Sequence, residues 1–214
     1  MPRIYARRRF GIAAALAGLL AFAGLFNAPA ASAALPTPIA ASTARTYLSS
    51  LTVAPEDRTG YDRTLFPHWI TISGTCDTRE TVLMRDGSNV VTNSACTSTS
   101  GSWYSEYDGA TLTSSSSLDI DHLVPLAEAW DSGASKWTTA QRQAFANDLT
   151  RPQLIAVSAS SNRSKGDKDP AEWVPTRSAY VCTYVRAWVQ VKHYYNLSVD
   201  PAEKSALQGY LAAC

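Results

Sequence analysis

The order of local patterns along the chain constrains its fold more than any other feature. Between residues 58 and 113, short β-like runs alternate with turns rich in Gly, Asp, Asn and Ser. After Pro125 the patterns become mainly helical and stay so to the C-terminus. There is no βαβ rhythm and no internal repeat, so the sequence predicts an α+β fold with a β-rich N-terminal part and C-terminal helices.

The individual elements follow from hydrophobic periodicity and from capping residues. Leu118 to His122 alternates between apolar and polar side chains, which predicts a half-buried strand. Ser158 to Lys165 predicts two helical turns that stop at Gly166. Further strands are expected at 71–73, 81–84, 89–92 and 103–107, and further helices at 126–130, 138–148, 177–195 and from Asp200 onward.

Residues 1–33 have the pattern of a secretory signal peptide. Arginines precede an apolar run from Phe10 to about Phe26, and the small-residue site Ala31-Ser32-Ala33 follows. A membrane anchor is the less favoured alternative, because the run is near the minimum spanning length and is followed at once by this cleavage site. Arg7-Arg8-Arg9-Phe10 leaves both the Sec and the twin-arginine route open. The prediction is cleavage near Ala33 and a secreted, extracellular protein without a membrane segment.

The remaining chain is expected to form two parts. Residues 34–57 are a lead-in helix and linker, and residues 58–214 are a single domain. Its four cysteines form an even set in an exported chain, which favours two disulfides over a metal site. Three pairings are possible, and we favour Cys76 with Cys96 and Cys182 with Cys214 because each pair lies within one local unit.

The charge of the mature chain excludes a strongly basic nucleic-acid binder. The full chain has 19 Lys+Arg and 18 Asp+Glu, and loss of the four arginines of the signal segment leaves 15 against 18. The net charge is then about −3, so contact with nucleic acid would have to depend on a local basic patch and on metal.

Two motifs carry candidate chemistry. The first is Asp121 to Pro125, which reads Asp-His-Leu-Val-Pro, and the second is Asn162 to Asp167, which reads Asn-Arg-Ser-Lys-Gly-Asp. A histidine can take a proton from water at neutral pH, and carboxylate and amide oxygens bind a hard divalent cation. His122 alone is more often structural than catalytic, and Asn162 alone is more often a capping residue. Asp119 competes with Asp121 as a ligand.

Together the two motifs resemble the HNH endonucleases of the ββα-metal superfamily, most closely a secreted bacterial branch. The resemblance covers roughly residues 103–207, with core motifs at about 103–175. It implies that His122 is the general base, that Asp121 and Asn162 hold the metal, and that Lys165 or Arg163 contacts phosphate. Many relatives carry an Asn where this chain has Gln153, a position that usually braces the loop.

The resulting prediction is a monomeric, secreted endonuclease of low sequence specificity that cleaves nucleic acid, with DNA favoured over RNA as the substrate. It would use one divalent metal, Mg²⁺ in preference to Mn²⁺ or Ca²⁺, and would leave 5′-phosphate ends. One rival is a non-catalytic secreted module that binds envelope, polysaccharide or a partner protein and keeps a vestigial site. Another is a phosphatase or phosphodiesterase acting on small esters.

Overall fold

The computed structural model describes residues 1–2 and 36–214 of the 214-residue chain. It divides into two units, Met1–Ala31 and Ser32–Cys214, and the description below concerns the second. Almost all of the predicted signal peptide, residues 1–33, therefore lies outside the described residues. In the part that is described, no helix combines the length and the apolar character needed to cross a bilayer.

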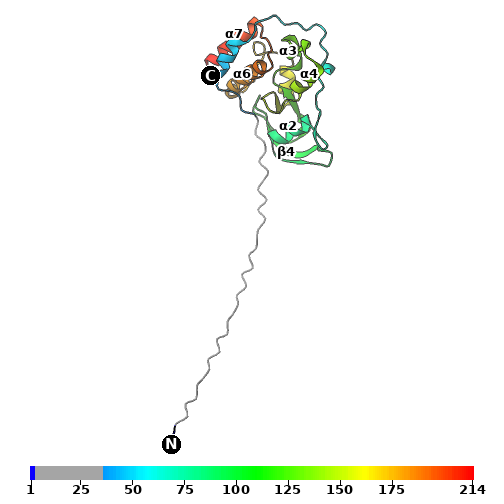
Figure 1. Ribbon diagram of the computed structural model, residues 1–214, viewed down its shortest axis with the longest axis vertical. Helices are drawn as coiled ribbons and strands as arrows, with labels where there is room; N and C mark the ends of the chain where they lie inside the picture. Colours follow the sequence, from blue (N-terminus) through cyan, green and yellow to red (C-terminus); the bar gives the residue numbers. More distant parts are fainter. Residues whose placement is uncertain (3–35) are drawn as a thin grey trace. The chain divides into compact units, whose positions relative to one another are not determined.

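Three helices that are distant in sequence pack together at one end of the second unit (Figure 1). They are α1 (Ala41–Ser50), α6 (Ser178–Tyr194) and α7 (Pro201–Ala212), and each contacts the other two. Asp200 caps α7 because its carboxylate accepts hydrogen bonds from the Ala202 and Glu203 backbone N–H groups. The disulfide Cys182–Cys214 ties the chain end to α6.

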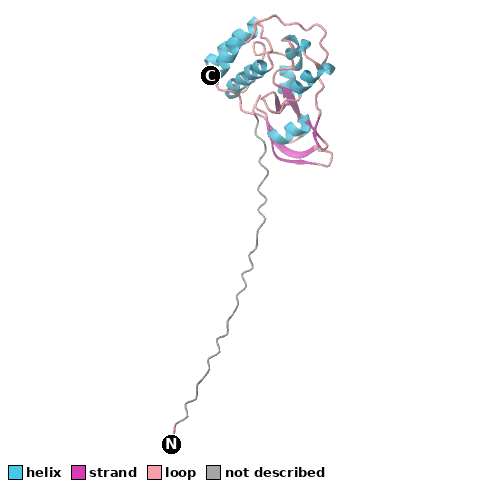
Figure 2. Cartoon of the chain, viewed as in Figure 1, coloured by secondary structure: helices cyan, strands magenta, loops and turns pink. Residues whose placement is uncertain are grey.

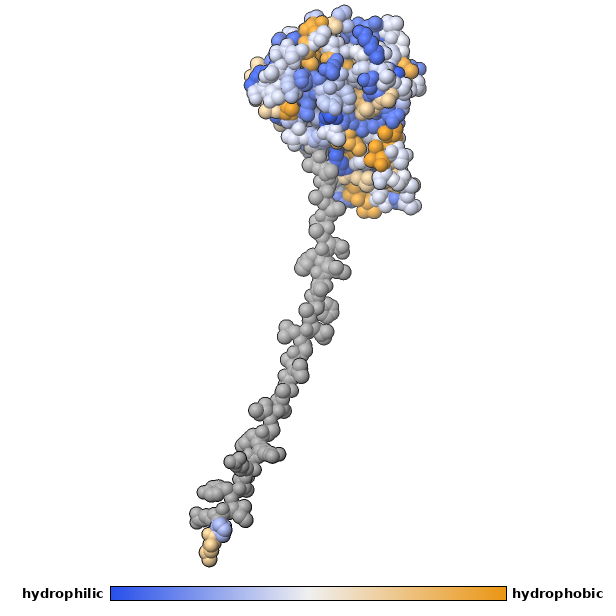
Figure 3. Space-filling view, viewed as in Figure 1, coloured by the Kyte–Doolittle hydropathy of each residue, from blue (hydrophilic) through white to orange (hydrophobic). Residues whose placement is uncertain are grey.

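The β-rich region lies at the other end, where Figure 2 shows strands around a helix. Antiparallel β1 (Thr71–Ser73) and β2 (Cys76–Asp77) lead into α2 (Thr78–Asp86). A three-stranded sheet follows, made of β3 (Gly87–Thr92), β4 (Ser98–Tyr104) and β5 (Thr111–Leu112). Apolar surface gathers over this region in Figure 3, in line with the exposed side chains of Ile72 and Val91.

One predicted strand of this region is a helix instead. Residues 81–84 read as β-like, but they lie inside α2, with Val82 and Leu83 buried. Asp77 caps this helix by accepting a hydrogen bond from the Glu80 N–H, at 2.8 Å. This N-terminal cap, together with burial of one apolar face, outweighs the β preference of a short run containing Thr and Val.

The third sheet consists of β6 (Leu118–His122) and β7 (Leu154–Ser158), which pair antiparallel over their full length. The register places Asp121 opposite Ile155 and His122 opposite Leu154. The chain between these strands forms α3 (Leu126–Asp131) and α4 (Thr139–Ala146), with a 3-10 turn, η3 (Ala134–Lys136), between them. The helix α5 (Ala159–Lys165) follows β7 directly and contacts both strands.

The hydrophobic core has two parts. The larger one joins α1, α3, α4, α6 and α7, and the smaller one lies between α2 and the β6–β7 pair. Two further 3-10 turns, η1 (Arg63–Leu65) and η2 (Ser115–Ser117), lie in the connections.

The α+β prediction is confirmed, and so are both favoured disulfides, Cys76–Cys96 and Cys182–Cys214.

Candidate active site

A pocket of about 190 Å³ lies where β6 ends and α5 passes beside it. Asp121, His122 and Asn162, three of the predicted site residues, line this pocket, and so does Arg163. Its other lining residues are Arg63, Ile120, Pro125, Leu126, Gly166 and Asp167. The fold therefore brings together two motifs that are separated by about forty residues of sequence.

Local signals place α5 against the strand. Ser158 is its N-cap and accepts a hydrogen bond from the Ser161 N–H. Asp108 anchors this end because its Oδ2 atom accepts hydrogen bonds from the hydroxyls of Ser158 and Ser161. At the other end Gly166 adopts φ 57°, a left-handed conformation that glycine adopts readily, and terminates the helix as predicted.

The ring of His122 is held in a defined tautomer. Its Nε2 atom lies 2.9 Å from the carbonyl oxygen of Ala146, the last residue of α4. A carbonyl oxygen only accepts, so Nε2 carries the hydrogen and Nδ1 keeps its lone pair. Burial lowers the pKa of His122 to about 3, so the ring is neutral at physiological pH. A neutral imidazole with a free Nδ1 lone pair can accept a proton.

Asp121 lines the same pocket and is held by two donors. The Lys165 ammonium lies 2.8 Å from its Oδ1 atom, and the Tyr107 hydroxyl lies 2.5 Å from Oδ2. Burial raises the pKa of the Asp121 carboxyl, and Lys165 opposes that shift. Burial and the nearby Asp121 charge raise the pKa of Tyr107 far above its ordinary value, so the phenol remains a donor.

Lys165 occupies a different position from the one expected of a phosphate contact. Its side chain is 0 % exposed, and its ammonium donates to Asp121 and, at 3.0 Å, to the carbonyl oxygen of His122. The resemblance implied a role on phosphate for Lys165 or Arg163. In this structure Lys165 supports the strand end, whereas the side chain of Arg163 is 77 % exposed and lies 3.8 Å from Asp119.

Asn162, on α5, also lines the pocket. Its Nδ2 atom donates to Asp119 Oδ2 at 3.1 Å, so the amide oxygen is the acceptor left over. Each carboxylate oxygen of Asp121 accepts one hydrogen bond and retains a second lone pair. One carboxylate oxygen and one amide oxygen on a single pocket fit a small, hard divalent cation, although the Lys165 ammonium competes for Asp121.

Gln153 braces the turn after His122. Its Oε1 atom accepts from the Val124 N–H at 3.2 Å, and its Nε2 atom donates to the Val124 carbonyl oxygen at 2.8 Å. The side chain is fully buried, so both backbone groups of Val124 are satisfied without water. The Gln153 side chain, which is longer than the Asn of many relatives, thus stabilises the loop that follows β6.

Two residues at the site were not identified from the sequence as site residues. Arg63, on η1, lines the pocket, and the ring of Trp69 stacks on that of His122 with centroids 5.4 Å apart. Both precede the motifs by more than fifty positions, and no local spacing links them to the strand. The sequence offers Arg63, with Arg79 and Arg85, as a candidate for a phosphate contact, but nothing in the sequence distinguishes it from an ordinary solvated arginine.

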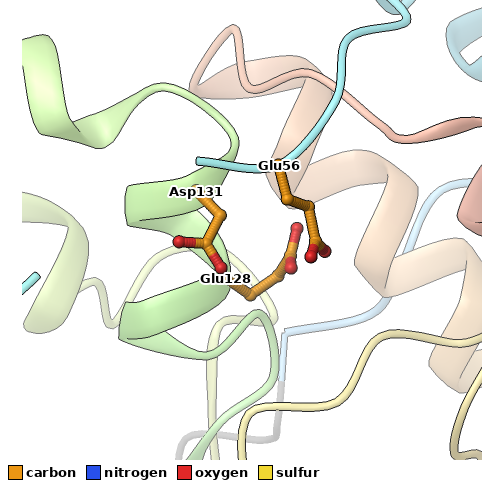
Figure 4. A group of neighbouring side chains, drawn as sticks. All are labelled: Glu56, Glu128 and Asp131. Carbon is orange, nitrogen blue, oxygen red and sulfur yellow. The ribbon is translucent and has the colours of Figure 1, made fainter. Parts of the chain in front are cut away.

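A second acidic group lies beside α3. Figure 4 shows the carboxylates of Glu56, Glu128 and Asp131 turned toward one another, and their oxygen atoms lie within 4.8 Å. Lys192 pairs with Glu128 at 2.5 Å, and Arg58 pairs with Asp131 at 2.6 Å. Cations therefore neutralise both buried carboxylates, and we assign this group a structural role.

The fold and the pocket define an α+β protein whose site is built from two antiparallel strands and the helix that follows them. Residues 83–209, more than half of the chain, match the family described as GmrSD restriction endonucleases, C-terminal domain. The chain belongs to this family, and its domain is accordingly of a nuclease type. No solved structure matches the chain.

A fungal relative from Arthroderma benhamiae is 59 % identical over 186 residues, which cover 85 % of this chain and 91 % of the relative. It is named an uncharacterized secreted protein. The resemblance noted from the motifs was to a bacterial branch, whereas this relative is fungal.

Proposed function

We propose that the protein is a secreted, divalent-metal-dependent endonuclease of the HNH type that hydrolyses phosphodiester bonds of nucleic acid. The observation that carries the proposal is the shared pocket of His122, Asp121 and Asn162, with His122 fixed as a neutral base. Membership of a restriction-endonuclease domain family supports the reaction class. The secreted relative and the leader pattern of residues 1–33 support action outside the cell.

In this proposal the Nδ1 atom of His122 accepts a proton from a water molecule. The water oxygen attacks phosphorus in line with the leaving 3′ oxygen, so that one P–O bond forms while the other breaks. The products carry a 5′-phosphate and a 3′-hydroxyl group. A positioned general base typically contributes ~10²–10⁴-fold to the reaction rate, and the hydrogen bond from Nε2 to the Ala146 carbonyl oxygen fixes the ring in the tautomer that this role requires.

Asp121 and Asn162 would hold the metal ion, with Mg²⁺ the preferred ion and Mn²⁺ or Ca²⁺ as alternatives. When bound, the ion would neutralise charge that develops on the phosphate and the leaving oxygen. Tyr107 and Lys165 hold the Asp121 carboxylate in place, each through one hydrogen bond. Because Lys165 is bound to Asp121, the phosphate would be contacted by other cationic side chains.

Arg63 and Arg163 are the candidates for that contact. Both are exposed and line the same pocket. Arg163 pairs weakly with Asp119, whereas no carboxylate in residues 36–214 lies within ion-pair distance of the Arg63 guanidinium. An unneutralised guanidinium at a pocket mouth matches the geometry and charge of a phosphate group.

Plasmid cleavage tests the proposal directly. Wild-type protein should degrade plasmid in Mg²⁺, lose this activity in EDTA and regain it on addition of Mg²⁺ or Mn²⁺. His122→Ala should reduce the rate by at least ~10²-fold, while His193→Ala, a histidine on α6 far from the pocket in sequence, should not. Metal-independent cleavage, or full activity of His122→Ala, would exclude this mechanism.

The same assay separates the rivals. A non-catalytic binding module would leave plasmid intact at every metal concentration. A small-ester phosphatase would turn over a chromogenic phosphate ester and leave plasmid intact. Parallel digestion of single-stranded RNA would measure the preference for DNA.

A further inference from the structure

A residue upstream of the family match reaches the proposed base. The rings of Trp69 and His122 stack with centroids 5.4 Å apart and an interplanar angle of 26°. Trp69 lies outside residues 83–209, which match the nuclease family. Figure 1 shows the segment that leads to it, in cyan, passing beside α4 toward α2.

Trp69 adopts an unusual backbone conformation. Its φ angle is 58°, in the left-handed region that bulky side chains rarely occupy. Such a conformation persists only where the surroundings fix it, and conformations of this kind concentrate at functional sites. Hydrogen bonds on both sides of Trp69 fix its backbone.

Asn147 clamps the chain on both sides of Trp69. Its Nδ2 atom donates to the Pro67 carbonyl oxygen at 2.8 Å, and its Oδ1 atom accepts from the Ile70 N–H at 3.2 Å. The same amide also bonds to Thr78 Oγ1 and to the Gln143 carbonyl oxygen, which fixes its own orientation. A single buried amide thus sets the conformation of residues 67–70.

Asn147 directly follows Ala146, whose carbonyl oxygen holds the Nε2 atom of His122. The end of α4 therefore fixes the imidazole twice, at its edge through Ala146 and on its face through Asn147 and Trp69. The ring of His68 adds an edge contact, with its centroid 6.4 Å from that of His122. Rotation of the imidazole about its Cβ–Cγ bond would break both the hydrogen bond and the stack.

We propose that Trp69 and Asn147 are positioning residues that hold the plane of His122 so that its Nδ1 atom faces the pocket. This inference rests on the proposed nuclease function, because it assigns a task to groups around the proposed base. The competing explanation is that Trp69 merely fills space, since it also packs against the smaller hydrophobic core. The two explanations predict different effects on cleavage when Trp69 is replaced by a bulky, non-aromatic residue.

The test compares Trp69→Phe with Trp69→Leu in Mg²⁺-dependent plasmid cleavage. We expect Trp69→Leu to lower kcat by at least ~10-fold with KM nearly unchanged, because small misplacement of a reacting group is costly. Trp69→Phe retains a flat ring and should recover most of the rate. Tyr104→Leu, which changes a half-exposed aromatic residue on β4, is the matched control and should match wild type.

NMR spectroscopy reports the environment of the His122 ring directly. The chain has three histidines, so the His122 ring protons can be assigned in an NMR spectrum by substitution. Their ring-current shift should be lost in Trp69→Leu and kept in Trp69→Phe. If Trp69→Leu does not fold, Asn147→Asp serves as the second variant. This substitution removes the Nδ2 donor, and it should move the same resonances and lower kcat.

Equal kcat in Trp69→Leu, Trp69→Phe and wild type would overturn the inference, as would unchanged His122 resonances in Trp69→Leu. Failure of the proposed function has a different signature, because wild type itself would then not cleave plasmid. In that case the NMR comparison still decides whether Trp69 orders the ring of His122.

Discussion

Replacing Lys165 by Met tests the support of the site most sharply. The substitution keeps the length and apolar stem of the side chain but removes the ammonium, which donates to Asp121 at 2.8 Å and to the His122 carbonyl oxygen at 3.0 Å. Asp121 would retain only its hydrogen bond from Tyr107. Breaking a buried ion pair from one side typically costs ~3–5 kcal/mol.

The lower end of that range applies here, because Asp121 borders the pocket and water can replace part of the lost contact. A loss of ~3 kcal/mol corresponds to a decrease in Tm of roughly 6–12 °C for a domain of this size. Thermal unfolding in EDTA provides the measurement. Lys168→Met is the matched control, since Lys168 is an exposed lysine of the same segment and should change stability by less than ~0.5 kcal/mol.

Added metal is expected to have the opposite effect on the stability of Lys165→Met. If Asp121 is a ligand, loss of the competing ammonium should strengthen metal binding, and Mg²⁺ at 100 times its Kd would restore ~2.7 kcal/mol. Mg²⁺ should therefore raise the Tm of Lys165→Met more than that of wild type. Equal Tm values for Lys165→Met and Lys168→Met in EDTA would refute the structural argument, and an equal Mg²⁺ effect on Lys165→Met and wild type would refute the assignment of Asp121 as a ligand.

Three further outcomes are expected from other parts of the molecule. Lys192→Met should lower the free energy of unfolding in urea by ~3–5 kcal/mol, since it leaves the buried Glu128 and Glu203 without their shared cation; addition of Glu203→Gln should recover part of the loss. Although burial acts to raise the pKa of Asp148, hydrogen bonds from Thr150 and other neighbours lower it, so this group stabilises the fold above its unfolded pKa and loses that effect as pH falls through its folded pKa. Urea unfolding of Asp148→Asn should accordingly vary less with pH between about 5 and 2 than that of wild type, and an unchanged slope would contradict the pKa shift. Arg63→Ala should raise KM for an oligonucleotide and flatten the salt dependence of binding by about one unit of slope, at unchanged Tm.

Local signals in the sequence were sufficient for the elements that carry the site. The alternation of Leu118 to His122 marked a strand, and Ser158 and Gly166 marked the two ends of α5. These signals are short-range, because capping and alternation depend on neighbours within a few residues. In the structure this helix packs against the strand, and Asp121 and Asn162 share one pocket.

The tertiary partners of the site could not be predicted in the same way. The resemblance implied that Lys165 or Arg163 contacts phosphate, yet the helix turns the Lys165 ammonium inward to Asp121. The choice between solvent and a buried carboxylate depends on the position of α5 relative to Tyr107 and β6, which no spacing encodes. The same holds for Trp69, whose position depends on an amide almost eighty residues away.

The long connection between the two strands explains why His122, the proposed base, and its supports form one unit. A hairpin of β6 and β7 alone would present His122 with its Nε2 atom unpaired, because Ala146 belongs to the inserted helix α4. The position of α4 depends in turn on the upstream segment, since Arg142 donates to the Leu65 carbonyl oxygen and Asn147 to that of Pro67. The orientation of His122 is therefore set by residues 63–70 and by α4 together. The unit that orients His122 accordingly begins upstream of residue 83, where the family match starts.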